Sequence, residues 1–410
     1  MNTCCLATAA WLLTLGATPV HAADPQPTAT DQHPLAAASS LAPETTLERY
    51  RAELSRFRQA FGGARDLPDE RFFLFGLGLR QKLLYQNGAL VKALSGEVVR
   101  RWAVREDFIL PADCTVVIRT TDDREARIVE DERGMWLVED GRTNQVPNTG
   151  APVRLPDFAA YPFPAVLRVL HQELLVNVTP RGPVPNFFVY SKPWYRDGAI
   201  MAMAFRETGN LGCIRDWILG LCEVFDRNNA GETEADNPGQ VLYLLSLVSD
   251  KNHRLVPKVL TEAARFETNG PAGKYLQGRS DFALHPVYQT KWMKYGLRAL
   301  GLPDPYTVPP VPDSYAALFW MDYRDAHVPG RDADDRDRYP YLGWACDHFR
   351  GMKKSPVSNR DYPLTWEAHA SQAHYEGIKP LSETYAARKL AAPHTWHAAE
   401  VLLYFLKPNP

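Results

Sequence analysis

From Phe163 onward one arrangement recurs along the chain: polar or aromatic residues precede an apolar run that has the spacing of a helix. Ordinary amphipathic segments lie between these helix starts. Helices that are apolar all round must be buried, and amphipathic helices cover them, so the alternation predicts nested inner and outer helices. A plain helical bundle is the alternative. The six expected starts lie at Trp194, Asp236, His285, Asp313, Tyr362 and Pro393.

Three sections with other patterns precede this part of the chain. Residues 1–22 have the layout of a secretory signal peptide, with an apolar run and a Val20-His21-Ala22 cleavage site. Residues 23–45 are rich in Ala, Pro, Thr and Ser, which is typical of a disordered leader. We therefore expect export to the periplasm or the medium. The remaining chain divides into residues 46–155 and an α domain at residues 156–410.

Residues 46–155 combine one helix with several strands. The helix is expected to begin near Thr46 and to end at Gly62-Gly63. Leu83-Leu84-Tyr85 and Ala89-Leu90 flank an Asn87-Gly88 pair, which supplies the positive φ angles of a tight hairpin turn. The pattern predicts a small antiparallel β domain or insertion. Its further strands are expected at residues 97–104, 115–119, 125–130 and 135–139.

Composition excludes several classes of partner. The net charge is -2 with both signs mixed, which gives no basic field for nucleic acid. No later apolar run reaches the roughly 20 residues that span a bilayer. Gly76-Leu77-Gly78 lacks a dinucleotide fingerprint, and His394 and His397 lack the spacing of a zinc site. We expect no cofactor and no metal, and the sequence leaves the oligomeric state open.

Two motifs resemble a known family. Trp194-Tyr195-Arg196-Asp197-Gly198-Ala199 resembles the W-x-R-D-x-A stretch of glucoamylase-like six-hairpin glycosidases, and Trp396 opens a stretch similar to their W-x-x-A-E-x-L-L helix. The resemblance covers roughly residues 160–410 and implies a mainly α fold, an (α/α)6 toroid of inner and outer helices. It also implies that Trp194, Tyr195, Arg196 and Asp197 hold the terminal sugar.

The same stretch has an independent interpretation from its residues alone. A helix N-terminus favours a carboxylate such as Asp197, and Trp194 and Tyr195 offer flat apolar faces to a ligand. A capped helix, in which Asp197 pairs with Arg196 or with first-turn amides, is an equal alternative. We expect the other sugar contacts at Gln240, Asp281, Trp366, His394 and Trp396.

Paired carboxylates are the expected catalytic groups. Inverting glycoside hydrolysis needs an acid and a base about 6.5–9.5 Å apart. Asp236, and after it Glu234, is the candidate acid, because crowded carboxylates raise one another's pKa. Glu367, which follows Trp366, is the candidate base. A solvated acidic loop with Asp236 as a helix cap, and capping by Glu367, are the alternatives.

The favoured function is an exported glycoside hydrolase that cleaves a terminal sugar from an oligosaccharide or glycan with inversion. A polysaccharide lyase that uses Tyr288, His285 and Arg279 is a second hypothesis. A carbohydrate-binding envelope protein without catalysis is a third. Fold alone cannot separate the three, because site chemistry and architecture vary independently.

Overall fold

The computed structural model describes the chain from Leu41 to Leu406 with several internal gaps. The signal peptide and most of the leader expected before it lie outside the described residues. All of the description below concerns one unit, Leu41–Pro410. The described residues are 41–61, 63–147, 150–190, 192–228, 230–281, 283–311, 313, 315, 354–369 and 375–406.

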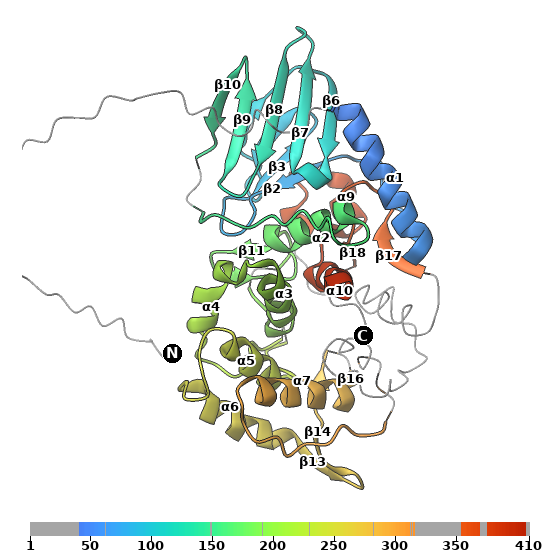
Figure 1. The fold of residues 1–410 in the computed structure, drawn as a ribbon. Coiled ribbons are helices and arrows are strands. Elements are labelled where there is room, and N and C mark those ends of the chain that lie inside the picture. The colour runs from blue at the N-terminus through green and yellow to red at the C-terminus, as the bar shows by residue number, and fades with distance from the viewer. Residues whose placement is uncertain are drawn as a thin grey trace, which may run out of the picture. The chain divides into compact units, whose positions relative to one another are not determined.

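Two antiparallel sheets follow the first helix (Figure 1). The four-stranded sheet has the order β2-β3-β4-β5, and the five-stranded sheet has the order β10-β9-β8-β7-β6. The first sheet comprises β2 (Phe73–Phe75), β3 (Leu83–Gln86), β4 (Ala89–Lys92) and β5 (Val98–Arg101). The second comprises β6 (Val104–Leu110), β7 (Thr115–Thr120), β8 (Glu125–Glu130), β9 (Met135–Glu139) and β10 (Arg142–Gln145). The strands expected at 115–119, 125–130 and 135–139 are confirmed.

The predicted hairpin is also confirmed. Strands β3 and β4 pair in register from Leu83 with Lys92 to Gln86 with Ala89. Between them, Asn87 and Gly88 have φ angles of 48° and 73°. These are the left-handed angles that an Asn-Gly turn adopts at little cost.

Helix α1 (Pro43–Phe61) covers part of the sheet region and contacts β6. Its buried residues Leu47, Tyr50, Leu54 and Phe57 recur every three or four positions, as the sequence predicts. The helix begins three residues before Thr46 and ends at Phe61, where the Gly62-Gly63 pair removes helical propensity.

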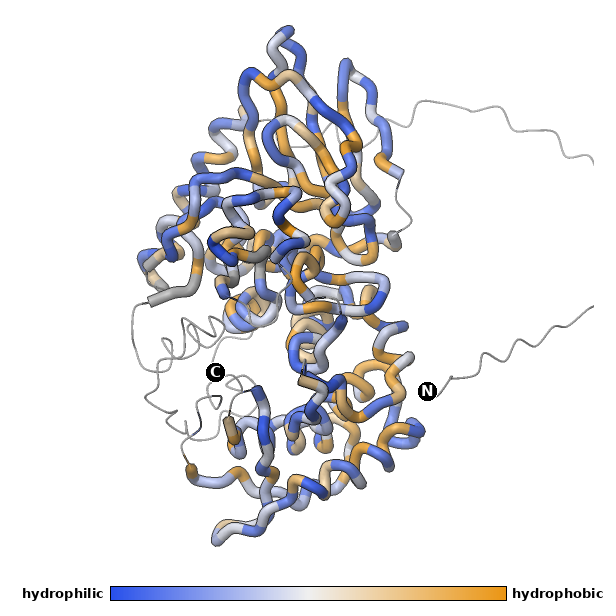
Figure 2. Tube along the Cα trace, turned by 180° about the vertical axis from the view of Figure 1, so that it is seen from behind, coloured by the Kyte–Doolittle hydropathy of each residue, from blue (hydrophilic) through white to orange (hydrophobic). Residues whose placement is uncertain are grey.

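The later helices form a row in which α2, α10, α3, α5 and α7 pack neighbour against neighbour (Figure 1). The helices are α2 (Pro164–Val176), α3 (Tyr195–Thr208), α4 (Arg215–Leu219), α5 (Asn237–Ser246), α6 (Leu255–Ala263), α7 (Pro286–Ala299), α9 (Glu383–Ala387) and α10 (Thr395–Leu406). Glycines permit the closest contact: a Cβ at Gly239 would lie 2.4 Å from the Met293 nitrogen, and one at Gly296 would lie 2.5 Å from the Gly239 oxygen. Figure 2 shows long hydrophobic stretches in these helices.

The predicted (α/α)6 toroid is wrong, and with it the resemblance to six-hairpin glycosidases. The structure is 37% helix and 22% strand. Its described residues hold nine helices, fewer than the six pairs of a toroid, together with the two sizeable antiparallel sheets. The fold therefore combines a β region with a helical layer.

The part after Phe163 is not helical throughout, because short strands interrupt it. Two strands pair with distant segments: β1 (Gly63–Arg65) lies parallel to β17 (Lys354–Ser358), and β18 (Trp366–Ala368) pairs with β19 (Leu390–Pro393). The others form hairpins: β11 (Val178–Thr179) with β12 (Gly182–Pro183), β13 (Glu267–Gly270) with β14 (Gly273–Leu276), and β15 (Arg279–Ser280) with β16 (Ala283–Leu284).

Four of the six expected helix starts begin a helix, namely those of α3, α5, α7 and α10. The start at Tyr362 instead leads into strand β18. A β-branched residue followed by an aromatic, Thr365-Trp366, suits a strand, and a short apolar run cannot by itself distinguish strand from helix. Around the start at Asp313 the chain is described only at Asp313 and Tyr315.

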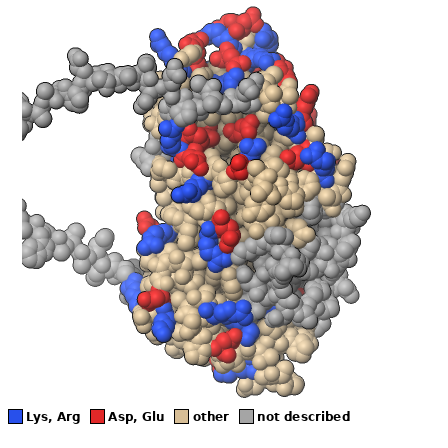
Figure 3. All heavy atoms as spheres, in the orientation of Figure 1, with Lys and Arg blue, Asp and Glu red and all other residues tan. Residues whose placement is uncertain are grey.

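Surface charge is mixed in sign on the face that Figure 3 shows, in keeping with the net charge of -2. No helix among the described residues has the length and apolar character needed to cross a bilayer.

Candidate functional site

The N-termini of helices α3, α5, α7 and α10 meet at one place in the row. Arg196, in the first turn of α3, reaches Asp236 at the start of α5. Asp197, the next residue, accepts a hydrogen bond of 3.2 Å from Thr395 Oγ1 at the start of α10. Helix N-termini carry partial positive charge, so their convergence favours the carboxyl groups found there.

Arg196 is the centre of a buried ionic group, which we call the Arg196 cluster: Arg196, Glu234, Asp236 and Asp281. Its Nε donates to Asp236 Oδ2 at 2.9 Å, its Nη1 to Asp281 Oδ2 at 2.5 Å and its Nη2 to Glu234 Oε2 at 2.5 Å. The side chains of Arg196 and Glu234 are each 5% exposed and that of Asp281 is 13% exposed. One guanidinium thus holds three carboxyl groups from two loops.

Asp236 is fixed from several sides. Besides Arg196, the Ser280 hydroxyl donates to its Oδ1 at 2.7 Å and Gln240 Nε2 donates to its Oδ2 at 2.8 Å. It precedes α5 without capping that helix through its side chain, so the capping alternative does not apply. Ser280 and Gln240 therefore hold the Asp236 carboxyl group in place against Arg196.

Glu234 has the properties of a proton donor. It accepts hydrogen bonds from Arg196 and, at 2.9 Å, from the backbone nitrogen of Asp281. Burial raises its pKa to about 8, although the positive charge of Arg196 opposes the shift. A carboxyl group with this pKa keeps its proton at neutral pH. Glu234 thus fits the acid role better than Asp236, the first choice from sequence.

Asp281 is supported by an aromatic pair. The Tyr315 hydroxyl donates to Asp281 Oδ2, and the Tyr315 ring stacks on His285 with 3.9 Å between centroids. His285 Nδ1 lies 2.9 Å from Asp313 Oδ1, and Asp313 also accepts from the first-turn amides of α7. Sequence reasoning missed Tyr315 as a site residue, because nothing in its local sequence marks its contact with Asp281.

Asp197 faces α10 rather than the carboxyl groups around Arg196. His394 Nδ1 is 3.8 Å from Asp197 Oδ1, and Asp197 is 3% exposed. Burial raises the pKa of Asp197 to about 7, against the attraction of Arg196. Burial also lowers the pKa of His394 to about 3, so this imidazole is neutral. Asp197 can therefore exchange a proton near neutral pH.

Aromatic residues flank this side of the site. The ring centroids of Trp194 and Tyr190 are 5.5 Å apart, and those of Tyr190 and His394 are 6.4 Å apart. Both Trp194 and Tyr190 are partly exposed. Trp396 is buried, 6.5 Å from the Tyr288 ring.

Tyr195 does not contribute its ring to this aromatic side of the site. Its hydroxyl donates to the Glu223 carbonyl at 3.0 Å, and its backbone nitrogen donates to Asp226 Oδ2 at 2.6 Å. The residue ties the start of α3 to the loop before α5, which is a structural contact.

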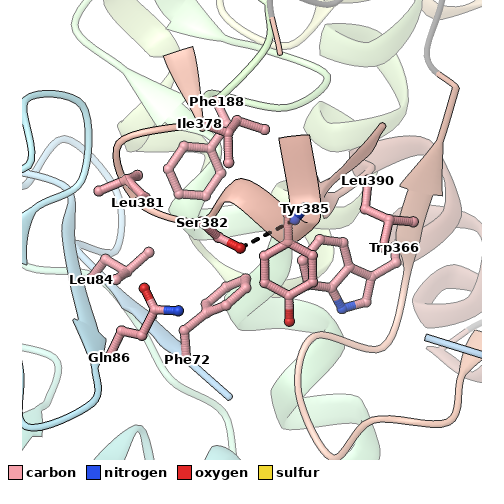
Figure 4. Close-up of a pocket in the computed structure, with 10 residues that line it drawn as sticks. All are labelled: Phe72, Leu84, Gln86, Phe188, Trp366, Ile378, Leu381, Ser382, Tyr385 and Leu390. Atoms are coloured by element: carbon pink, nitrogen blue, oxygen red, sulfur yellow. Dashed lines mark hydrogen bonds between the residues drawn. The ribbon is translucent and has the colours of Figure 1, made fainter. Parts of the chain in front are cut away.

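The ring of Trp366 packs against aromatic residues outside the Arg196 cluster. Trp366 stacks on Tyr385 at 4.7 Å and meets the edge of Phe72 at 5.3 Å (Figure 4). The cavity among the side chains that Figure 4 draws is about 10 Å³, which is room for at most one water. Trp366 is therefore a packed core residue. Glu367 lies in strand β18 instead of at a helix start, and its side chain is outside the described part.

The three residues of the lyase hypothesis differ in their exposure to solvent. His285 and Tyr288 are buried at the start of α7, whereas Arg279 is exposed and lies 3.7 Å from Glu232. In the described part of the chain, no three His, Cys, Asp or Glu residues are grouped as metal ligands.

Comparison with family models, with curated proteins and with solved structures finds no match for this chain. Its function must therefore be argued from the site.

Proposed function

We propose that this protein is a glycoside hydrolase in which Glu234 protonates the leaving oxygen and Asp281 activates the attacking water. The observation that carries the proposal is a buried, proton-holding carboxyl group beside a second carboxyl group under one arginine. Glycoside hydrolysis uses such a pair, one group as acid and the other as carboxylate. Proximity alone permits other acid–base chemistry, so the substrate is argued separately.

The acid and the base differ in their surroundings. Glu234 accepts hydrogen bonds from Arg196, from the Asp281 amide and, at 3.3 Å, from Asn228 Nδ2. Burial and the neighbouring acids Asp236 and Asp281 nevertheless favour its neutral form. Asp281 accepts from Arg196 and from the Tyr315 hydroxyl, two donors that favour a carboxylate. Its side chain is also the most exposed of the cluster, so water can reach it most easily.

Sugar is the substrate class that the neighbouring aromatics support. Trp194, directly before α3, and Tyr190 have partly exposed rings that contact each other, and the Tyr190 ring also contacts His394. Sugar rings bind through one apolar face and a rim of hydroxyls, so flat aromatics next to carboxyl groups suit them.

The test compares Glu234→Gln with Glu232→Gln on α- and β-linked oligosaccharides. Glu232 is an exposed acid in the same loop, so it controls for the change of a carboxyl group to an amide there. We expect Glu234→Gln to lower kcat by about 10²–10⁴-fold, the usual contribution of general acid catalysis, and Glu232→Gln to leave kcat unchanged.

Two readouts accompany the rates. Thermal unfolding establishes that both variants are folded, and NMR of the first products identifies their anomer and so the stereochemical outcome. Absence of hydrolysis by the wild-type protein across the panel, or full activity of Glu234→Gln, would reject the proposal. An unsaturated product would indicate a lyase instead.

A further inference from the structure

The charge balance of the site bears on which sugars it accepts. The three groups of the Arg196 guanidinium, Nε, Nη1 and Nη2, each donate to a different carboxyl group of the cluster. Three of its five N–H groups therefore serve the protein's own acids. A substrate carboxylate that displaced one of these acids would break a buried ion pair, which costs about 3–5 kcal/mol in folded proteins.

Several backbone amides at the helix N-termini also have acceptors within the protein. Asp226 accepts from the amide of Tyr195 in α3, and Asp313 accepts from two first-turn amides of α7. In α10 the amide of Trp396 donates to His394 Nδ1. Four of the first-turn amides of α3, α7 and α10, the kind of donor that binds anions at a helix start, thus already have acceptors.

The other cations near the site do not offset the negative charge of its acids. Lys192 Nζ donates to the carbonyls of Asp226 and Arg227, and Lys294 of α7 pairs with Asp304 at 2.6 Å. Lys291, further along α7, and Arg196 are buried. Against these two cations stand six carboxyl groups at the converging N-termini, those of Asp197, Asp226, Glu234, Asp236, Asp281 and Asp313. At pH 6 Glu234, with a pKa of about 8, and most of Asp197, with a pKa of about 7, are protonated, so the negative charge comes from the other four.

We propose that the sugar bound beside the Arg196 cluster is an amino sugar with a protonated amine, preferred over the neutral sugar, and that uronic acids are excluded. This inference rests on the proposed function, whose substrate class it narrows. An ammonium group would meet a surplus of carboxyl oxygens, whereas a uronate would add a further negative charge to them. Charges near a protein surface interact strongly enough at contact distance to decide between these ligands.

The experiment measures binding to the Glu234→Gln protein, which does not turn over its ligand. At pH 6 Glu234 is neutral, so glutamine preserves its charge. The probes are methyl glucosaminide, methyl glucoside and methyl glucuronide, each in both anomers, titrated by calorimetry. We expect the amine to bind about tenfold more tightly than the neutral sugar, a difference of about 1.4 kcal/mol, and the uronate at least about tenfold more weakly than the neutral sugar.

A second variant tests the cause. Asp281→Asn removes one negative charge, so it should reduce the difference in affinity between the amino sugar and the uronate. Glu97→Gln, on the exposed loop beside β5, is the matched control and should leave the order unchanged.

The outcomes separate the two proposals. If the wild-type protein hydrolyses glycosides but the uronate binds as well as the neutral sugar, the charge inference is wrong and the hydrolase stands. Equal affinity for all three sugars would likewise reject the charge inference and leave the hydrolase proposal standing. If no sugar binds and none is hydrolysed, both proposals fail together.

Discussion

Two buried arginines occupy opposite kinds of surroundings in this molecule. Arg80, in the β region, pairs with Glu130 at 2.9 Å and also donates to the carbonyls of Asp131 and Glu132. Glu130 accepts the amides of Gly76 and Leu77. Its neighbour Lys82 donates to the carbonyls of Gly76 and Gly78, so this group, the Arg80 cluster (Arg80, Lys82 and Glu130), has mostly backbone partners.

The Arg196 cluster differs in both charge and partners. One cation faces three acids, and these acids reach it from the loop before α5 and from the β15–β16 hairpin. The Arg80 cluster has two cations for one acid. Hydrogen bonds to the backbone fix the Arg80 cluster to the fold. In the Arg196 cluster the acids outnumber the cation, so one of them can keep a proton and donate it. In this molecule the buried arginine that acids outnumber is the one at the proposed active site, whereas the other mainly fixes the fold.

The largest expected effect comes from removing each arginine. Arg196→Met leaves three buried carboxyl groups without their shared cation, and breaking a buried pair in this way costs about 3–5 kcal/mol of unfolding free energy. Arg80→Met leaves Glu130 with two backbone donors, so its cost should be smaller. Urea unfolding of both variants at pH 7 measures the difference.

A result in which Arg80→Met is the more destabilised variant would contradict the contrast between the clusters. Acidification sharpens the test. Lowering the pH to 5 protonates acids that Arg196 had balanced, so the deficit of Arg196→Met should shrink more than that of Arg80→Met.

The β region could be predicted from sequence better than the helical region. The Asn87-Gly88 turn fixes a local register, and strand alternation in 115–139 is a short-range signal, so both were found. The prediction of a toroid was wrong because an apolar run shows that a segment is buried, but not which other element packs against it. Trp366 was expected at a helix start, yet its strand pairs with Leu390–Pro393, a contact that local pattern cannot indicate.

The site was predicted in part for the same reason. Arg196, Glu234, Asp236 and Asp281 are each marked by their position before a helix, and the structure joins them. Tyr315 was missed because its hydroxyl reaches a residue 34 positions away. The ranking of Asp236 over Glu234 depended on distance to the helix, whereas the hydrogen bonds around each acid decide which keeps a proton.

The second effect concerns Glu234 and pH. The pKa of Glu234 is about 8 in the folded protein and near 4.5 when exposed, so the native state holds a proton that the unfolded state lacks in this window. Its contribution to stability is therefore present below about pH 4.5 and is lost as the pH rises towards 8, by about 1 kcal/mol per pH unit. Asp197 and Glu173, whose pKa values burial raises to about 7 and to about 8, contribute to the same slope, so Glu234→Gln should make it shallower in urea unfolding between pH 5 and 8. An unchanged slope in Glu234→Gln, or its loss in Glu232→Gln, would show that Glu234 is not the proton store.

The smallest effect has the opposite sign and comes from the Arg80 cluster. Burial lowers the pKa of Lys82 to about 7, although Glu130 attracts its charge. Between pH 7 and the ordinary lysine pKa, the unfolded state binds a proton that the native state lacks, so stability rises with pH by about 1 kcal/mol per unit. Measured from pH 7 to 9, this effect is followed over about two pH units, against about three for Glu234. Lys82→Met should remove this upward contribution and so lower the slope, and Lys92→Met, at an exposed pair with Glu97, should leave the slope unchanged. If Lys82→Met keeps the wild-type slope, Lys82 does not supply this contribution, and the Arg80 cluster does not respond to pH in the direction opposite to that of Glu234.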